Sequence, residues 1–414
     1  MSSGSSVPSA AQLARTCYDI YRLRVSPELP EACAWNLELL TSILLDRTEL
    51  DHPFVSSLVD WQPFGGDPND GHRAIADLLV CKAFEFGITT NIDALIEMAA
   101  HELGENDLGC ALDGDEMNLP NARLLKIHGC CRKNKYQIVW THDQLSGPKK
   151  VVKLVDGLTR SANWLRAILP NRDLLILGFW SDWHYLNDVL IEKLGERNDR
   201  LVVLIDKAAS SDLELKAPEL WSWASSHENF KHVQMDGAEF LDYLRREFSS
   251  KLLNALLFGA KDEFKQRFGS DFSGNEEFGG LTSAEYYELR RDASGKAPPG
   301  AAPDKNPSPE MMTTGVCHLW LRSVGGVLDG LRYRMPDKSL VRVINGLGRV
   351  MSYVQKRYAR SPDAESDYLI VVGGADDGGA SPDIVRGQQP NTFVRRASKG
   401  EWLPDTAAYA RNWS

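Results

Sequence analysis

The sequence lacks several features that would place it in a familiar class. No apolar run approaches the roughly 20 residues needed to cross a bilayer. The first residues hold no basic segment followed by an apolar core, so we expect no secretory signal peptide. None of the seven cysteines belongs to a Cys-x-x-Cys pair, which argues against a disulfide framework or a zinc ribbon. We therefore expect reduced thiols, a cytoplasmic location and no membrane anchor.

Positive charge is also scarce. The 47 Lys and Arg residues are outnumbered by 57 Asp and Glu residues, which gives a net charge of −10. An acidic chain is not drawn to nucleic acid or to anionic membranes, so we do not expect direct nucleic-acid binding. The basic runs at 149–153 and 356–360 are short, and such runs are typical of a solvated face.

The first 250 residues alternate apolar runs of strand length with amphipathic segments. This pattern predicts an α/β domain with a parallel sheet flanked by helices. Uninterrupted apolar runs are expected of strands that are covered on both faces. The predicted strands are 86–90, 124–128, 173–178, 201–206 and 230–235, and the predicted helices are 93–103, 186–195 and 238–248.

The remainder of the chain is less regular. Residues 251–310 predict a helical connector that ends in a flexible linker rich in Pro, Gly and Ala at 293–310. Residues 313–360 predict two helices from two apolar stripes, and 367–374 predicts a strand. We therefore expect a smaller, mostly helical region at 311–414, to which no motif assigns any chemistry.

Three polar fragments follow predicted strands of the first domain. They are Thr89-Thr90-Asn91-Ile92-Asp93, Lys126-Ile127-His128-Gly129 and the segment from Leu177 to Trp183. Ligands of open parallel sheets bind beyond the carboxyl ends of the strands, so these side chains are expected to face one crevice. Each fragment alone has a plainer interpretation: Asn-x-Asp is commonly a helix cap, His-Gly a turn, and Asp-Trp a packed aromatic beside a solvated carboxylate.

The order of the fragments is more specific than any one of them. Thr-Thr-Asn-Ile-Asp, Ile-His-Gly and Ile-Leu-Gly-Phe-x-Ser resemble the sirtuin succession Thr-Gln-Asn-x-Asp, His-Gly and Gly-Thr-Ser. Gly-Phe-x-Ser-Asp-Trp-x-x-Leu-Asn is closer to the sirtuin-like domains of bacterial antiphage defence proteins. The resemblance covers residues 1–250 and implies a Rossmann-like fold that uses NAD as a substrate.

The resemblance also implies roles for single residues. Asn91 would orient a water or the nicotinamide ribose, and His128 would be the general base. The NAD-binding residues implied are Ser2, Pro8, Thr90, Asp93, Gly178, Phe179, Ser181, Asp206 and Asp236. For Asp206, a ribose contact and a simple strand-end turn are left open, and the assignment of Asp236 to an adenine-side loop rests on weaker similarity.

The first departure from the family concerns zinc. Sirtuin deacylases hold a structural zinc on two Cys-x-x-Cys pairs after the histidine, whereas this chain has adjacent Cys130 and Cys131 and then His142. Too few ligands lie in range for that site, so we expect no zinc. We interpret Cys130 and Cys131 as ordinary packed thiols.

The second departure concerns the phosphate-binding turn. The family pattern Gly-Ala-Gly-x-Ser-x-x-Ser-Gly-x-Pro places Met1 on its first x, Ser2 and Ser5 on its serines, and Pro8 on its proline. The strand and Gly-Ala-Gly would then precede Met1, and residues 9–14 would begin a helix. A serine-rich, unstructured start is the alternative.

These observations predict an NAD glycohydrolase of antiphage type that forms ADP-ribose and nicotinamide. The family implies a homo-oligomer and a HerA-type ATPase or another defence protein as partner. The alternatives are an NAD-dependent protein deacylase, which the absent zinc module disfavours, and an inactive nucleotide-binding subunit.

Overall fold

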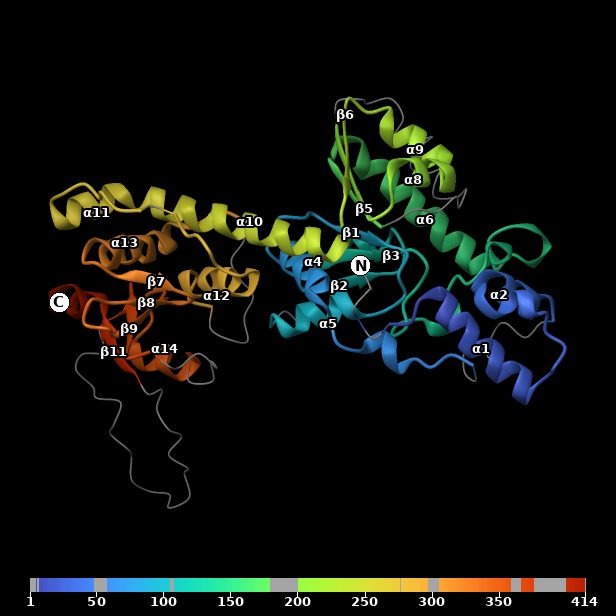
Figure 1. Cartoon of the computed structure of the whole chain (residues 1–414), viewed down its shortest axis with the longest axis horizontal. Coiled ribbons are helices and arrows are strands. Elements are labelled where there is room, and N and C mark those ends of the chain that lie inside the picture. The colour runs from blue at the N-terminus through green and yellow to red at the C-terminus, as the bar shows by residue number, and fades with distance from the viewer. Residues whose placement is uncertain are drawn as a thin grey trace, which may run out of the picture. The chain divides into compact units, whose positions relative to one another are not determined.

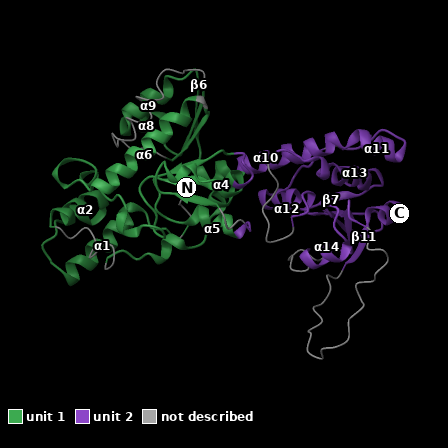
Figure 2. Ribbon diagram, turned by 180° about the vertical axis from the view of Figure 1, so that it is seen from behind, with its two compact units in different colours: residues 1–79, 84–101, 106–242 green, residues 80–83, 102–105, 243–414 purple. Residues whose placement is uncertain are grey.

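Two units of structure account for the chain. The computed structural model describes residues 5, 7–47, 58–104, 108–178, 200–275, 277–296, 305–358, 366–375 and 400–413. Unit 1 comprises residues 1–79, 84–101 and 106–242, and unit 2 comprises 80–83, 102–105 and 243–414 (Figure 2). None of the helices in the described part of the chain combines the length and apolar character that a membrane crossing requires.

Unit 1 begins with a helical layer. Helix α1 (Ala10–Arg24) starts where the sequence predicts a helix, and Ser9 caps it by accepting a hydrogen bond from the backbone N of Gln12. Its buried residues pack with α2 (Leu37–Asp46), η1 (Glu31–Trp35) and η2 (Gln62–Gly65). The same cluster includes Trp140, so this layer also covers the segment that follows His128.

Within the described residues of unit 1, six parallel strands form two sheets. The first sheet has the order β1-β3-β2, with β1 (Gly87–Thr89), β2 (Gly109–Ala111) and β3 (Ala122–Lys126). The second has the order β4-β5-β6, with β4 (Leu174–Leu177), β5 (Leu201–Asp206) and β6 (Asn229–Gln234). All five predicted strands are confirmed, whereas β2 was not foreseen. Among the described residues no strand joins β1 to β4.

Figure 1 labels β1, β2 and β3 of the first sheet and β5 and β6 of the second, and one hydrophobic cluster contains residues of both sheets. It contains Leu125 of β3 and Val202 and Leu204 of β5, together with residues of α6 (Val152–Ile168), α8 (Ser210–Lys216) and α9 (Pro218–Ser225). The α/β class and the Rossmann-like parallel arrangement are therefore confirmed. The predicted helix 186–195 lies outside the described residues.

Further helices belong to the described part of unit 1. Helix α5 (Leu95–Glu102) follows β1 and confirms the helix predicted at 93–103, and α4 (Asp70–Val80) precedes β1. Short turns of 3₁₀ helix are η3 (Glu116–Asn118), η4 (Lys135–Gln137), η5 (His142–Gln144), η6 (Gly147–Lys149) and η7 (Leu169–Asn171). Helix α10 (Gly237–Gly259) begins in unit 1, continues into unit 2 and is longer than the predicted 238–248.

Unit 2 is built on a five-stranded sheet of order β11-β10-β9-β8-β7. Strands β9, β10 and β11 are parallel, whereas β7, β8 and β9 are antiparallel. The bounds of the strands are β7 Val327–Asp329, β8 Arg332–Arg334, β9 Leu340–Asn345, β10 Tyr368–Val372 and β11 Glu401–Pro404. Those of the helices are α11 Lys261–Phe268, α12 Ser283–Ala293, α13 Pro309–Ser323, α14 Met351–Tyr358 and α15 Asp405–Ala410.

The C-terminal region is a mixed α/β structure rather than the mostly helical one expected. The first predicted helix exists as α13 but ends at Ser323, and residues 327–345 form β7, β8 and β9. Leu340, Val343 and Ile344 are spaced as on a helix, yet they belong to a strand buried on both faces. The strand predicted at 367–374 is confirmed as β10, and the predicted linker separates α12 from α13, with 297–304 outside the described residues.

Candidate functional site

A cavity of about 730 Å³ lies in unit 1, and we call it the Asn91 cavity. Its lining brings together five of the residues predicted for the NAD site, which are Pro8, Thr90, Asn91, Asp93 and His128. They come from the start of the chain and from the segments that follow β1 and β3. Ser2, Phe179 and Ser181 lie outside the described residues.

The pairing of β1 with β3 explains why distant fragments meet. The strands are parallel, and Thr89 stands opposite Lys126 in their register. The segments that follow β1 and β3 therefore leave the sheet at the same edge. Thr89 Oγ1 accepts a hydrogen bond from the Asn91 backbone N at 3.0 Å, and this bond turns the chain towards the cavity.

Asp93 combines a structural and a site-facing position. Its Oδ1 accepts a hydrogen bond at 3.1 Å from the backbone N of Leu95, the first residue of α5, in a local Asx turn. The residue is 6 % exposed and lines the Asn91 cavity. Asp93 therefore contacts the start of α5 and also contributes to the cavity wall.

The start of α1 also faces this cavity. Ser9, Ala10 and Gln12 line it beside Pro8. The first turn of a helix presents backbone N–H groups and the positive end of the helix dipole, which attract an anion such as phosphate. The first turn of α1 carries no acidic side chain that would oppose this attraction.

His128 follows β3 on a turn that requires glycine. Gly129 has a φ of +98°, and an added Cβ would lie 3.2 Å from both Asn134 Oδ1 and Ile138 Cγ1. Burial lowers the pKa of His128 to about 4. The imidazole is therefore neutral at pH 7 and can accept a proton or a hydrogen bond.

His128 also lines a second cavity, of about 670 Å³, which we call the Lys135 cavity. Basic residues outnumber acidic ones in its lining: Arg132, Lys133, Lys135, Lys153 and Arg160 are present with Asp113 and Glu116. Arg160 forms an ion pair with Asp113 at 2.7 Å. The imidazole thus stands in the wall between two cavities of different charge.

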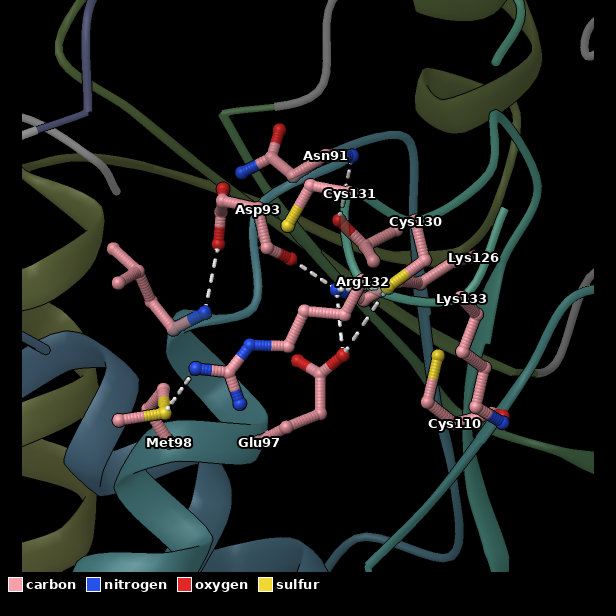
Figure 3. A network of polar contacts seen from close by, with 12 residues as sticks. Asn91, Asp93, Glu97, Met98, Cys110, Lys126, Cys130, Cys131, Arg132 and Lys133 are labelled. Carbon is pink, nitrogen blue, oxygen red and sulfur yellow. Dashed lines mark hydrogen bonds and ion pairs between the residues drawn. The ribbon is translucent and has the colours of Figure 1, made fainter. Parts of the chain in front are cut away.

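Lys126 is a buried residue that contacts Asp93 in the wall of the Asn91 cavity, and it was not predicted as a site residue. It is 1 % exposed, donates to the backbone O of Asp93 and forms an ion pair of 2.7 Å with Glu97 (Figure 3). A lysine in a buried strand needs such partners, so its place in the predicted strand was a usable signal. Nothing in the sequence identified Glu97 as the partner.

His72 of α4 was also missed. It is fully buried, and its Nε2 has no hydrogen-bond partner among the described residues. Burial lowers the pKa of His72, while the nearby carboxylate of Asp93 opposes that shift. The histidine therefore adds a neutral polar group on the buried side of Asp93.

Gly178, Asp206 and Asp236 lie at the carboxyl ends of the second sheet and are absent from the described lining of the Asn91 cavity. Asp206 Oδ1 accepts from the Ala208 backbone N at 2.9 Å, which is the strand-end turn left open above. Asp236 caps α10 by accepting from the backbone N of Ala238 at 2.8 Å and pairs with Lys207 at 2.7 Å.

The zinc site of sirtuin deacylases was tested against the cysteines present. In the described residues the metal-type cluster found is Glu97, Cys110 and Cys130, whose ligand atoms lie within 4.8 Å of one another. The ammonium of Lys126 already stands against this cluster, 2.7 Å from Glu97 Oε1 and 4.0 Å from Cys130 Sγ. The side chains present therefore fit a buried ion-pair cluster rather than a structural zinc.

Comparison with known proteins assigns the domain. Residues 86–227 match the family model described as SIR2-like domain. No curated protein matches the chain. The matched range runs from β1 to α9 and includes Asn91, Asp93 and His128. Unit 1 of this chain therefore contains a SIR2-like domain.

Proposed function

We propose that the Asn91 cavity binds NAD and hydrolyses its nicotinamide–ribose bond, releasing nicotinamide and ADP-ribose. The observation that carries the proposal is the convergence of Asn91, Asp93, His128 and the start of α1 on one cavity of about 730 Å³. A SIR2-like domain agrees with chemistry on NAD.

The reaction needs little acid catalysis, because the nicotinamide ring of NAD already carries a positive charge and leaves as a neutral molecule. The bond breaks through an oxocarbenium-like state, which the protein stabilises by orienting the ring and excluding water from its leaving-group side. Asn91 orients the ribose or the attacking water, and the neutral His128 accepts a proton from a hydroxyl group or water. The N-terminus of α1 attracts the pyrophosphate.

Several observations favour hydrolysis over protein deacylation. Among the described residues, the metal-type group of Glu97, Cys110 and Cys130 has three members rather than the four of a structural zinc site, and the Lys126 ammonium already lies against it. The Lys135 cavity next to His128 is rich in basic side chains, which do not attract a lysine-containing peptide. An acyl-lysine peptide added with NAD should therefore not accelerate nicotinamide release.

The test measures nicotinamide release from NAD by the full chain, using chromatography. We expect turnover by the wild type and a loss of at least 100-fold in His128→Ala and Asn91→Ala. His101→Ala on the exposed end of α5 and Asn163→Ala on α6 are matched controls outside both cavities and should retain full activity. Full activity in His128→Ala would remove the assigned base. A wild type that binds NAD without releasing nicotinamide would favour a nucleotide-binding subunit.

We further propose that the activity serves antiphage defence by depleting NAD in the cytoplasm. An NADase that harms its own cell must be restrained, which favours control by a homo-oligomer or by a HerA-type ATPase, with residues 311–414 as the regulatory or assembly region. Phage challenge of cells that carry the wild type or His128→Ala, with NAD measured over time, tests this role. NAD loss without protection would contradict it.

A further inference from the structure

Three thiols meet beside Lys126. Cys110 lies in β2, while Cys130 and Cys131 form the turn after His128 and Gly129. All three are buried, and Cys110 Sγ, Cys130 Sγ and a Glu97 carboxylate oxygen lie within 4.8 Å of one another. Figure 3 shows these sulfur atoms around the ammonium of Lys126. Two segments that are 20 positions apart in the chain thus place their thiols together.

The surroundings of the three thiols are unequal. Hydrogen bonds from the Cys110 and Cys131 thiols, followed by the charge of Lys126, lower the pKa of Cys130 far below its usual range. The same contacts and burial raise the pKa values of Cys110 and Cys131. Lys126 Nζ stands 4.0 Å from Cys130 Sγ. Among the three described thiols, Cys130 Sγ is the sulfur that lies against the Lys126 ammonium, so it is the one best placed to carry negative charge and act as the nucleophile.

The balance of charge in the cluster favours the loss of one of its two acidic groups. One ammonium, on Lys126, faces two acidic groups, Glu97 and Cys130. Burial is the main cause that raises the pKa of Glu97, and a negative charge on Cys130 adds to it. A disulfide carries no charge, so its formation at Cys130 would leave one ammonium, on Lys126, facing one carboxylate, on Glu97.

We propose that Cys110 and Cys130 are a redox-active thiol pair that hydrogen peroxide converts into a disulfide. The Cys130 thiolate attacks one peroxide oxygen, the O–O bond breaks, and the leaving hydroxide takes a proton to become water, which leaves a sulfenic acid on Cys130. The sulfur of Cys110 then attacks Cys130 and gives up its proton as the S–O bond breaks, forming a second water and the S–S bond. The two thiols are oxidised and the peroxide is reduced.

Cys110 is the partner in preference to Cys131 for a geometric reason. Consecutive Cα atoms lie about 3.8 Å apart, whereas disulfides span Cα distances of about 4.4–6.8 Å. Bonding Cys130 to its neighbour Cys131 would therefore distort the turn that carries Gly129. The Cys110–Cys130 bond instead ties β2 to that turn, and it takes the thiolate away from Lys126.

The experiment exposes the full chain to a small excess of hydrogen peroxide, blocks the remaining thiols with N-ethylmaleimide and maps digested peptides by mass spectrometry. We expect a Cys110–Cys130 linked peptide that disappears with dithiothreitol. Cys131→Ser should keep the link, while Cys110→Ser should abolish it and leave a sulfenic acid on Cys130. Cys17, buried in α1 with a pKa raised to about 12, is the internal control and should stay unmodified.

Lys126→Met tests the source of the reactivity, and the rate of linking should fall at least tenfold. If this variant does not fold, the wild-type peptide map still decides the matter. A Cys130–Cys131 link, an unmodified Cys130, or zinc released when the thiols are blocked would each overturn the proposal. None of these readouts depends on NAD cleavage, so the thiol pair and the NADase assignment can fail separately.

Discussion

The two sheets of unit 1 have the same three-stranded parallel design but use their carboxyl ends differently. After β1 and β3, Asn91, Asp93 and His128 line one cavity. After β5 and β6, the carboxylates of Asp206 and Asp236 are engaged in a turn and a helix cap. A polar residue at a strand end is therefore only a candidate site residue. The carboxyl ends of the two sheets differ in whether such side chains line the Asn91 cavity.

The largest contrast concerns the two lysine–carboxylate pairs of these sheets. Lys126 and Glu97 have side chains only 1 % and 17 % exposed, whereas Lys207 beside Asp236 is 65 % exposed. Removing one partner of a buried pair leaves an unpaired charge, so Lys126→Met should cost about 3–5 kcal/mol of unfolding free energy. Urea denaturation measures this loss, and Lys207→Met should leave the midpoint almost unchanged. Equal effects of the two substitutions would contradict the contrast.

The second contrast concerns catalysis. Asn91→Ala should lower kcat for NAD cleavage at least 100-fold, or about 2.7 kcal/mol of transition-state stabilisation. Asp206→Asn retains an oxygen for the turn at Ala208 and should change kcat less than threefold. Steady-state kinetics with both variants decides the question. A large loss in Asp206→Asn would restore the ribose-binding role that the sequence left open.

The third contrast concerns how the stability of the fold depends on pH. The pKa of His128 is lowered from 6.5 to about 4 by burial, so between these values the unfolded chain binds a proton that the folded chain does not. Stability should therefore fall as pH drops from about 6.5 towards about 4, by at most about 1.4 kcal/mol per pH unit for this group. Unfolding curves measured at about pH 7, 6 and 5 give the slope of the unfolding free energy against pH, and His128→Gln should reduce that slope.

The second sheet responds at lower pH. The pKa of Asp236 is lowered from 3.8 to about 2, chiefly by its hydrogen bond with Lys207. Its contribution is complete above about 3.8 and is lost as pH falls towards about 2. If Asp236→Asn altered stability between pH 6.5 and 4 as strongly as His128→Gln, these assignments would be wrong.

The smallest contrast compares two helix caps. Ser9→Ala removes the cap of α1, and Asp236→Ala removes that of α10, each at about 1 kcal/mol. Of these two helices, α1 starts in the lining of the Asn91 cavity and α10 does not, so of the two variants Ser9→Ala alone should also raise KM for NAD, by about two- to fivefold. An unchanged KM would remove the helix terminus from the phosphate site.

Much of unit 1 could be predicted because its strands are continuous apolar runs followed by polar residues. Leu201–Asp206 and Leu124–Lys126 could hardly be anything else in an α/β pattern. The same reasoning misassigned Leu340–Asn345, because a strand buried on both faces has apolar residues at helical spacings as well. Period alone does not distinguish the two.

The site was predictable in its polar residues but not in its support. Asn91, Asp93 and His128 stand out at strand ends, and β1–β3 pairing brings them together. The partnership of Lys126 with Glu97 and Cys130 depends on side chains that meet from three segments, a relation that one sequence does not reveal. For Asp206 and Asp236 the sequence could not show that neighbouring backbone N–H groups engage their carboxylates.

The most direct test of the central claim is the fate of water during NAD cleavage. The full chain is incubated with NAD in ¹⁸O-labelled water, and the masses of the products are measured by mass spectrometry. Hydrolysis at the Asn91 cavity predicts unlabelled nicotinamide and ADP-ribose that carries a single ¹⁸O at the anomeric carbon, with both products lost in His128→Ala. Intact NAD, or ADP-ribose formed equally by wild type and His128→Ala, would contradict the account.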